Sequence, residues 1–207
     1  MPKRPSRARS VKKASGGRKS ATVHAREHGG RVHLYVGMSL DGYIATPDGG
    51  VAWLDPYQDA RAGFAPFMKT IGAAIMGRAT YDWALKEGNT DFGVPAYVVT
   101  HRPFAPPSSA VVPYTGDLRD LVRQVRERHP KDIWLMGGGS VTKAFADADL
   151  IDIWSVAFVP TLLGAGLPMF PQRTPAELRL KLVKTHTYPS GVVELRYERR
   201  GSPKENR

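Results

Sequence analysis

The stretch Leu135–Phe145, LMGGGSVTKAF, places three consecutive glycines between a short apolar strand and a predicted helix. Glycine permits tight turns and close backbone approach, and the free N–H groups at the start of a helix attract anions. Ser140 is predicted to cap this helix and to donate to a phosphate. The stretch matches neither G-x-G-x-x-G, because its sixth position is Thr142, nor the phosphate-loop pattern G-x-x-x-x-G-K-[ST]. The glycines therefore indicate either a phosphate-binding turn or a tight structural corner.

Two other strand ends carry residues suited to phosphate. The stretch Ile75–Tyr81 combines a glycine, an arginine fork and a hydroxyl, in Gly77, Arg78 and Thr80. Another strand end is followed by Thr100, His101 and Arg102. In open α/β sheets, ligands bind where strands end and helices begin. Each junction alone is typical of a capped turn, but three on one sheet predict a site for an extended, multiply phosphorylated ligand such as a dinucleotide.

Strands that alternate with helices predict an α/β fold. Strands are expected at 31–39, 72–77, 95–100, 132–137 and 151–160, and helices at 59–71, 78–85, 116–129 and 140–148. Residues 40–55 are expected to form a loop, and Pro66 is expected to kink or break its helix. The segments 177–188 and 191–200 alternate and are joined by Pro189, Ser190 and Gly191, as in a hairpin. The sheet is therefore predicted to be parallel in its body and mixed at one edge.

The composition is that of a globular protein and excludes several kinds of chemistry. The chain has 207 residues, of which 42% are hydrophobic and 24% charged. It contains no cysteine, which excludes disulfides, thiolate nucleophiles and cysteine metal sites. The apolar runs are too short to cross a bilayer, and the basic N-terminus lacks the apolar stretch of a secretory signal. We therefore expect a cytoplasmic protein with no membrane partner.

The net charge of +11 is concentrated in the N-terminal segment. Residues 1–31 hold ten Lys or Arg and a single acid, Glu27. Residues 1–30 are expected to form a disordered basic tail, and residues 201–207 a disordered C-terminus. Such an arm can bind nucleic acid through its phosphates, or it can be a solubilising extension. The motif His24–His28, HAREH, matches a zinc pattern, but the segment lacks an apolar face with which to dock, so we expect no metal site.

Ordered motifs identify a resemblance. The segments MSLDGYIA, DGGVAWL, IMGRATYD, VVT, IWLMGGGSV and LIDIWSVAFVPTLLGAGLPMF, followed by the hairpin, resemble the dihydrofolate reductase-like superfamily. The RibD C-terminal-domain branch of riboflavin biosynthesis is the most similar, and the resemblance covers residues 31–200. It implies a three-layer α/β/α fold with a mostly parallel, eight-stranded mixed sheet and a C-terminal antiparallel hairpin.

The resemblance also implies an NADPH-dependent reductase. It places Gly77, Arg78 and Thr80 at the cofactor's phosphates. It places Thr100, His101 and Arg102 near the adenosine 2′-phosphate, which favours NADPH over NADH. The turn of Gly137, Gly138 and Gly139, with Ser140 and Val141, is expected along the pyrophosphate and the nicotinamide. The family further implies a cis peptide between Gly137 and Gly138.

The substrate implied by the resemblance is a pteridine- or pyrimidine-like heterocycle, as in 5-amino-6-(5-phosphoribosylamino)uracil reductase or dihydrofolate reductase. Met38, Ser39, Trp53 and Phe64 are expected to line its pocket. Asp41 and Asp59 are the catalytic candidates, although Asp41 can instead fix its loop and Asp59 can cap a helix. The helix at 59–71 has only Arg61 and Lys69 as basic residues, unlike the Arg/His-rich helix of riboflavin reductases.

Two further expectations concern partners. Relatives of this fold often form dimers, so a homodimer is expected, with residues 151–159 and the loop at 160–170 as contributors. The alternative function is a non-catalytic nucleotide-binding or nucleic-acid-associated protein that uses the basic arm.

Overall fold

A central strand and its neighbours organise the chain. The computed structural model describes residues 30–171 and 177–199. The strands are β1 (Val32–Ser39), β2 (Tyr43–Ala45), β3 (Ile71–Gly77), β4 (Ala96–Val99), β5 (Val111–Tyr114), β6 (Asp132–Gly137), β7 (Ile153–Val159), β8 (Leu167–Pro168), β9 (Leu180–Thr187) and β10 (Val193–Arg199). The helices are α1 (Phe64–Thr70), α2 (Arg78–Lys86), α3 (Leu118–Arg128) and α4 (Gly139–Asp147), with 3-10 turns η1 (Ala52–Leu54) and η2 (Gln58–Gly63).

Eight of these strands form one sheet, in the order β5-β4-β3-β6-β1-β7-β10-β9. The six strands from β5 to β7 pair in parallel. β10 runs antiparallel to both β7 and β9. The predicted mostly parallel, eight-stranded mixed sheet and its C-terminal hairpin are therefore confirmed.

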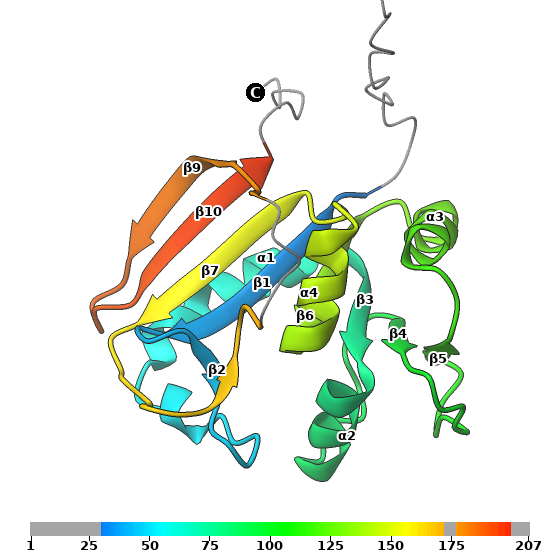
Figure 1. Cartoon of the computed structure of the whole chain (residues 1–207), viewed down its shortest axis with the longest axis horizontal. Coiled ribbons are helices and arrows are strands. Elements are labelled where there is room, and N and C mark those ends of the chain that lie inside the picture. The colour runs from blue at the N-terminus through cyan, green and yellow to red at the C-terminus, as the bar shows by residue number, and fades with distance from the viewer. Residues whose placement is uncertain (1–29, 172–176, 200–207) are drawn as a thin grey trace, which may run out of the picture.

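The helices lie in layers on the two faces of the sheet, with α4 in front of the sheet and α1 behind it in Figure 1. Alternate β1 residues point to opposite faces. Val32 and Leu34 are buried with residues of α3 and α4, such as Leu121 and Phe145. On the other face, Phe67 of α1 stacks on Tyr35 at a ring distance of 4.4 Å. Tyr81 of α2 packs with Ala74 and Met76 on that same face.

Helix α3 shows how a local pattern determines an element. Leu121, Val122 and Val125 are buried along one face, and Leu118 packs beside them, as the spacing predicted. Asp117 caps the helix by accepting from the N–H groups of Arg119 and Asp120.

The structure adds elements that the sequence patterns did not reveal. β2 and β8 pair as a small second sheet within segments that we predicted as loop. β5 lies at the edge of the main sheet and contains Pro113, a residue that edge strands tolerate. Pro66 does not break its helix, because it falls in the first turn of α1, where a missing N–H costs nothing.

The first described residue is anchored to helix α3. Gly30 is buried, and its carbonyl accepts a hydrogen bond of 2.9 Å from Arg126. The rest of the predicted N-terminal tail and residues 201–207 lie outside the described residues. Within the described ranges, no helix has the length and apolar character needed to cross a membrane.

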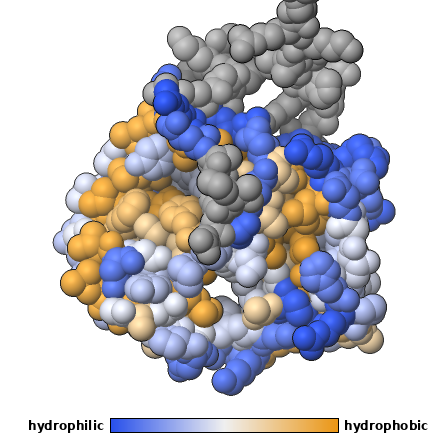
Figure 2. Space-filling model, in the orientation of Figure 1, coloured by the Kyte–Doolittle hydropathy of each residue, from blue (hydrophilic) through white to orange (hydrophobic). Residues whose placement is uncertain are grey.

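Apolar side chains are exposed near the C-terminal hairpin. Figure 2 shows hydrophobic surface over β7, β10 and β9. The exposed large hydrophobic residues include Leu182 and Val183 of β9, and Leu162, Leu167 and Phe170 between β7 and β9. Contiguous apolar surface of this kind is typical of interaction sites.

A buried carboxylate, Asp152, joins β1 and α3 to the segment that precedes β7. Asp152 is 3% exposed, and its Oδ2 accepts from the Val32 N–H at 2.9 Å and from Arg126 of α3 at 3.0 Å. We expect Asp152→Ala to lower the free energy of unfolding by about 3–5 kcal/mol, because it leaves the Arg126 charge without this partner.

Chemical denaturation measures this loss against a matched control. Asp120 forms an exposed pair with Arg123 at 2.9 Å, so Asp120→Ala should cost less than about 1 kcal/mol. Equal losses in the two variants would contradict a structural role for the Asp152 pair.

Candidate functional site

We call the strand ends at Gly77, Thr100 and Gly137 the first, second and third junctions. The first and third junctions lie side by side at one rim of the sheet. Met76 of β3 pairs with Gly137 of β6, so the ends of the two strands are level. Helices α2 and α4 both begin directly after these strand ends. Thr80 Oγ1 donates to the Gly137 carbonyl at 3.3 Å. The structure therefore brings the segment of Gly77, Arg78 and Thr80 into contact with the glycine turn.

This contact depends on the absence of side chains at two glycines. A Cβ atom at Gly138 would lie 2.7 Å from Thr80 Oγ1, and one at Gly77 would lie 2.8 Å from Val141 Cγ2. Gly137 and Gly138 both have positive φ, at 99° and 81°. The peptide between them is trans, so the expected cis bond is wrong. Two successive residues with positive φ turn the chain here instead, a conformation that glycine adopts readily.

Both helices at this rim begin without a side-chain cap. Their N-cap residues are Gly77 and Gly138, and neither can supply a side-chain acceptor. Ser140 is exposed in the first turn of α4, so its prediction as the cap is wrong, because the helix begins one residue earlier. Uncapped N–H groups at two adjacent helix starts form a suitable environment for an anion such as a pyrophosphate.

Arg78 is held in place at the same rim. Its Nε donates to Asp82 Oδ1 at 2.6 Å, one helical turn further along α2. Its guanidinium carbon lies 4.3 Å from the centre of the Phe104 ring, a cation–π contact. Phe104 belongs to the loop that follows β4, so it connects the second junction to the first. The sequence contained no local signal for this pairing.

The second junction is a turn closed by its own threonine. Thr100 is buried, and its hydroxyl accepts from the Arg102 N–H at 3.0 Å. His101 and Arg102 are exposed. Gly77 pairs with Val99, which places this turn next to the start of α2. Thr100 therefore shapes the turn, and the two exposed residues are the ones available to a ligand.

Asp41 binds the loop that follows β7. Its carboxylate accepts from the Ser39 hydroxyl at 2.6 Å and from the Gly164 and Leu163 N–H groups at 2.7 and 3.2 Å. The Ser39 hydrogen bond, followed by those of the loop, lowers the pKa of Asp41. An ionised, fully engaged carboxylate is a poor proton donor, so this geometry favours the loop-fixing alternative. Its catalytic role stays a prediction.

Asp59 binds the turn of the C-terminal hairpin. Its Oδ2 accepts from the Ser190 N–H at 2.8 Å, and its Oδ1 accepts from the N–H of the next residue, Ala60. Hydrogen bonding from Ser190 lowers the pKa of Asp59. This carboxylate therefore joins η2 to the hairpin, and its role in proton transfer also stays a prediction.

The four residues predicted to contact substrate separate into two groups. Met38 is buried in the core beneath α3 and α4, and Ser39 is buried and holds the Tyr43 N–H and Asp41. Trp53 packs on Val159 and Tyr188, and Phe64 is exposed at the start of α1 beside Trp134. Trp53 and Phe64 are therefore partly exposed on the α1 side. Met38 and Ser39 are buried and support the loop that follows β1.

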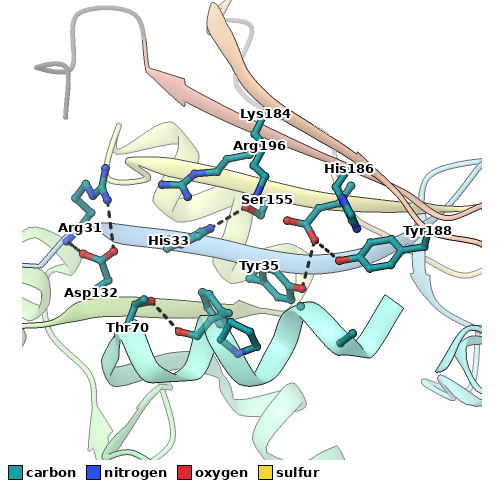
Figure 3. A pocket seen from close by; sticks show the side chains of 15 residues that line it. Arg31, His33, Tyr35, Thr70, Asp132, Ser155, Lys184, His186, Tyr188 and Arg196 are labelled. Atoms are coloured by element: carbon teal, nitrogen blue, oxygen red, sulfur yellow. Dashed lines mark hydrogen bonds and ion pairs between the residues drawn. The ribbon is translucent and has the colours of Figure 1, made fainter. Parts of the chain in front are cut away.

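A cavity of about 540 Å³ opens on the α1 face, over β1, β7 and the hairpin (Figure 3). We call it the hairpin trough and define it by His33, Tyr35, Ser155, Lys184, Glu194 and Arg196. None of the residues predicted to bind cofactor or substrate lines it. A signal was present, because polar His33 and Tyr35 alternate with Val32 and Leu34 along a strand that was otherwise predicted as buried.

Burial determines which protonation states occur in the trough. His33 Nε2 lies 2.8 Å from Ser155 Oγ. Burial, together with Arg196 and Arg31, lowers the His33 pKa to about 3, so this ring is neutral at pH 7. Glu194 accepts from the hydroxyls of Tyr35 and Tyr188 at 3.4 and 3.2 Å. Burial and Glu194 raise the pKa of Tyr188 to about 12, so its hydroxyl remains a donor.

A family model and a curated relative each match most of this chain. The model of the RibD C-terminal domain matches residues 31–194. The uncharacterized protein YwjB of Bacillus subtilis (strain 168) is 31% identical over 170 residues, which are 80% of this chain and 96% of that protein.

Solved structures share the fold. A putative riboflavin biosynthesis protein from Shewanella sp. PV-4 superposes with a TM-score of 0.75 and 25% identity, over 82% of this chain and 99% of its own. Dihydrofolate reductase from Enterococcus faecalis, solved with NADP(H), has a TM-score of 0.64 and 17% identity, over 84% of this chain and 98% of its own. The second likeness shows the fold alone.

The close approach at Gly138 generates a stability prediction. Gly138→Ala should lower the free energy of unfolding by about 3 kcal/mol, because it adds a clash with Thr80 to the strain of positive φ. Gly88 has a similar φ of 77°, but nothing lies within 4 Å of its Cβ position. Gly88→Ala should therefore cost only about 1 kcal/mol. Urea denaturation compares the two, and equal costs would exclude the close contact.

Buried His33 predicts a pH dependence of stability. Its pKa is about 6.5 when unfolded and about 3 when folded, so the unfolded chain binds the extra proton as the pH falls. This contribution to stability is complete above pH 6.5 and decreases at lower pH, by about 2 kcal/mol at pH 5.

The variant His33→Gln tests this assignment, because an amide can still reach Ser155 but does not titrate. Denaturation at pH 7 and pH 5 should show a smaller loss in the variant than in the wild type. Parallel losses in the two proteins would show that His33 is not the titrating group.

Proposed function

This chain belongs to the RibD C-terminal domain family, and from that premise we propose that it is an oxidoreductase that transfers a hydride from NADPH to a pteridine- or pyrimidine-like heterocycle. The family and the shared fold of the reductase from Enterococcus faecalis support a reductase-like function. The choice of cofactor and acceptor is our own proposal.

One observation carries the cofactor proposal: the Thr80 hydroxyl touches the Gly137 carbonyl where two uncapped helices begin. A dinucleotide has two linked phosphates with several anionic oxygens. The N–H groups at the starts of α2 and α4 would share them, since both helices open at the same rim. The glycines provide the close backbone approach that this requires.

Arg78 and Arg102 are the proposed partners of the 2′-phosphate. Asp82 and Phe104 hold the Arg78 side chain, which is 37% exposed, in one orientation. Arg102 is exposed in the neighbouring turn. A guanidinium whose position is already fixed loses little freedom when it binds, so it discriminates well between cofactors with and without this phosphate.

NADPH, when bound, supplies the hydride, and the chain must hold the acceptor and exclude water. Trp53 and Phe64 are the proposed apolar contacts of the heterocycle on the α1 side. In this proposal Asp41 and Asp59 act as positioning residues, because each already accepts hydrogen bonds from a distant loop.

The alternative function and the partners stay predictions. The basic arm that would bind nucleic acid lies outside the described residues. The homodimer stays a prediction, for which the exposed apolar residues of β9 and of the β7–β9 connection provide a surface. The cytoplasmic location and a place in riboflavin biosynthesis are likewise predictions.

Fluorescence titration tests the cofactor proposal, because the chain contains four natural tryptophan reporters. The full chain should bind NADPH saturably. Arg78→Ala should weaken NADPH by about ten-fold or more and NADH much less, because only NADPH loses a charged hydrogen bond.

Arg123→Ala is the matched control, because Arg123 also pairs with an aspartate on an exposed helix face but lies on α3. It should leave both affinities unchanged. Equal weakening of NADPH and NADH in Arg78→Ala would refute the 2′-phosphate contact, and absence of NADPH binding to the wild type would refute the proposed function.

A further inference from the structure

The cations of the hairpin trough are not all neutralised by the protein. Arg31 is paired with Asp132 and Glu198, at 3.9 and 3.7 Å. Glu194 accepts from two tyrosine hydroxyls. The two acids that line the cavity are thus already engaged. The other two cations are Lys184 and Arg196, and among the described residues Arg196 has only the distant carboxylate of Glu198, at 3.9 Å.

Lys184 and Arg196 are direct cross-strand partners in the hairpin. Both line the trough, so they present two positive charges on the same face of the sheet. Like charges placed opposite each other destabilise a strand pair. Figure 3 shows both side chains extending from the hairpin toward Ser155 and His33.

Neither cation has a strong acceptor in the described part of the chain. Arg196 Nε is buried and has no hydrogen-bond partner, and Nη2 lies 3.9 Å from Glu198. No carboxylate among the described residues lies within ion-pair distance of Lys184. A buried donor without an acceptor is costly, so an anion that accepted from Arg196 Nε would relieve this cost.

The floor of the trough is compatible with an anion. Ser155 offers a hydroxyl, and neutral His33 adds no negative charge. Arg196 and Arg31 both lower the His33 pKa, so their positive potential reaches this floor. The cavity volume of about 540 Å³ also falls in the range of small-molecule sites.

We propose that the hairpin trough binds a phosphate dianion between Lys184 and Arg196, with the Ser155 hydroxyl as a further contact. The anion is either free phosphate or the phosphate group of an aromatic monoester, for which Tyr35, Phe67 and Tyr188 provide a ring-lined wall. This site shares no residue with the rim proposed for NADPH, so the two proposals are independent.

Calorimetric titration of the full chain with inorganic phosphate at constant ionic strength tests the site. Lys184→Gln should raise the Kd for phosphate by about ten-fold or more, because it removes a charged contact. Lys181→Gln is the matched control: it lies on the same exposed strand, does not line the trough, and should change the Kd by less than about two-fold. Both variants keep the basic N-terminal segment, so phosphate bound by that segment contributes equally to the two measurements and does not affect their comparison.

A second variant and a second probe extend the test. Arg196→Gln should also weaken phosphate, while Lys184→Gln should leave NADPH affinity unchanged, which separates this site from the rim. Tighter binding of phenyl phosphate than of inorganic phosphate would support the site and identify an aromatic monoester as its ligand class. Equal affinity would support it as a site for free phosphate.

Two results would overturn the proposal. One is the absence of saturable phosphate binding to the wild type. The other is an equal loss of affinity in Lys184→Gln and Lys181→Gln, which would mean that phosphate adsorbs to general positive charge.

Discussion

The contact between the glycine turn and Thr80 is the constraint on which the rest of the rim depends. Helices α2 and α4 pack on opposite faces of the sheet, yet their first turns meet at the ends of β3 and β6. Only a chain without Cβ atoms at Gly77 and Gly138 fits between them. The same glycines leave both helix starts uncapped. The positions at which packing requires glycine are therefore also the positions with unsatisfied N–H groups. The glycines that form this structural corner therefore also leave free the N–H groups that an anion would need.

The helices cover the two halves of the sheet unequally. They pack over the strands from β5 to β1, while β9 is exposed along most of its length. On the front face this leaves apolar surface (Figure 2), and on the α1 face it leaves the polar hairpin trough (Figure 3). The two faces differ because residues alternate along a strand, so one hairpin presents apolar side chains on one face and charged side chains on the other. The antiparallel edge of the sheet is therefore the part that helices cover least, and its surface is available for further interactions.

Carboxylates join parts of the chain that are distant in sequence. Asp41 holds the loop after β7, Asp59 holds the hairpin turn, and Asp152 joins β1 to α3. In each case the acid accepts backbone N–H groups of another segment, and loops that would otherwise move freely gain a defined position. Two of these acids were predicted from sequence as catalytic candidates. An aspartate in such a connecting segment looks the same in sequence whether it is a proton donor or a loop anchor, and only the position of the groups that donate to it distinguishes the two.

The sequence by itself determined the main strands and helices, though not β2, β5 and β8, because strand alternation, helical spacing and glycine at strand ends are local properties. It predicted the faces of α3, the parallel body of the sheet, the hairpin, and the three junctions of one rim. The tertiary structure alone decided which distant residues meet: Phe104 against Arg78, Thr80 against Gly137, and Lys184 opposite Arg196. It also decided that the Gly137–Gly138 peptide is trans and that Ser140 is not a cap. These features depend on strand register, loop path and helix start, which result from packing of the whole chain and have no local pattern to signal them.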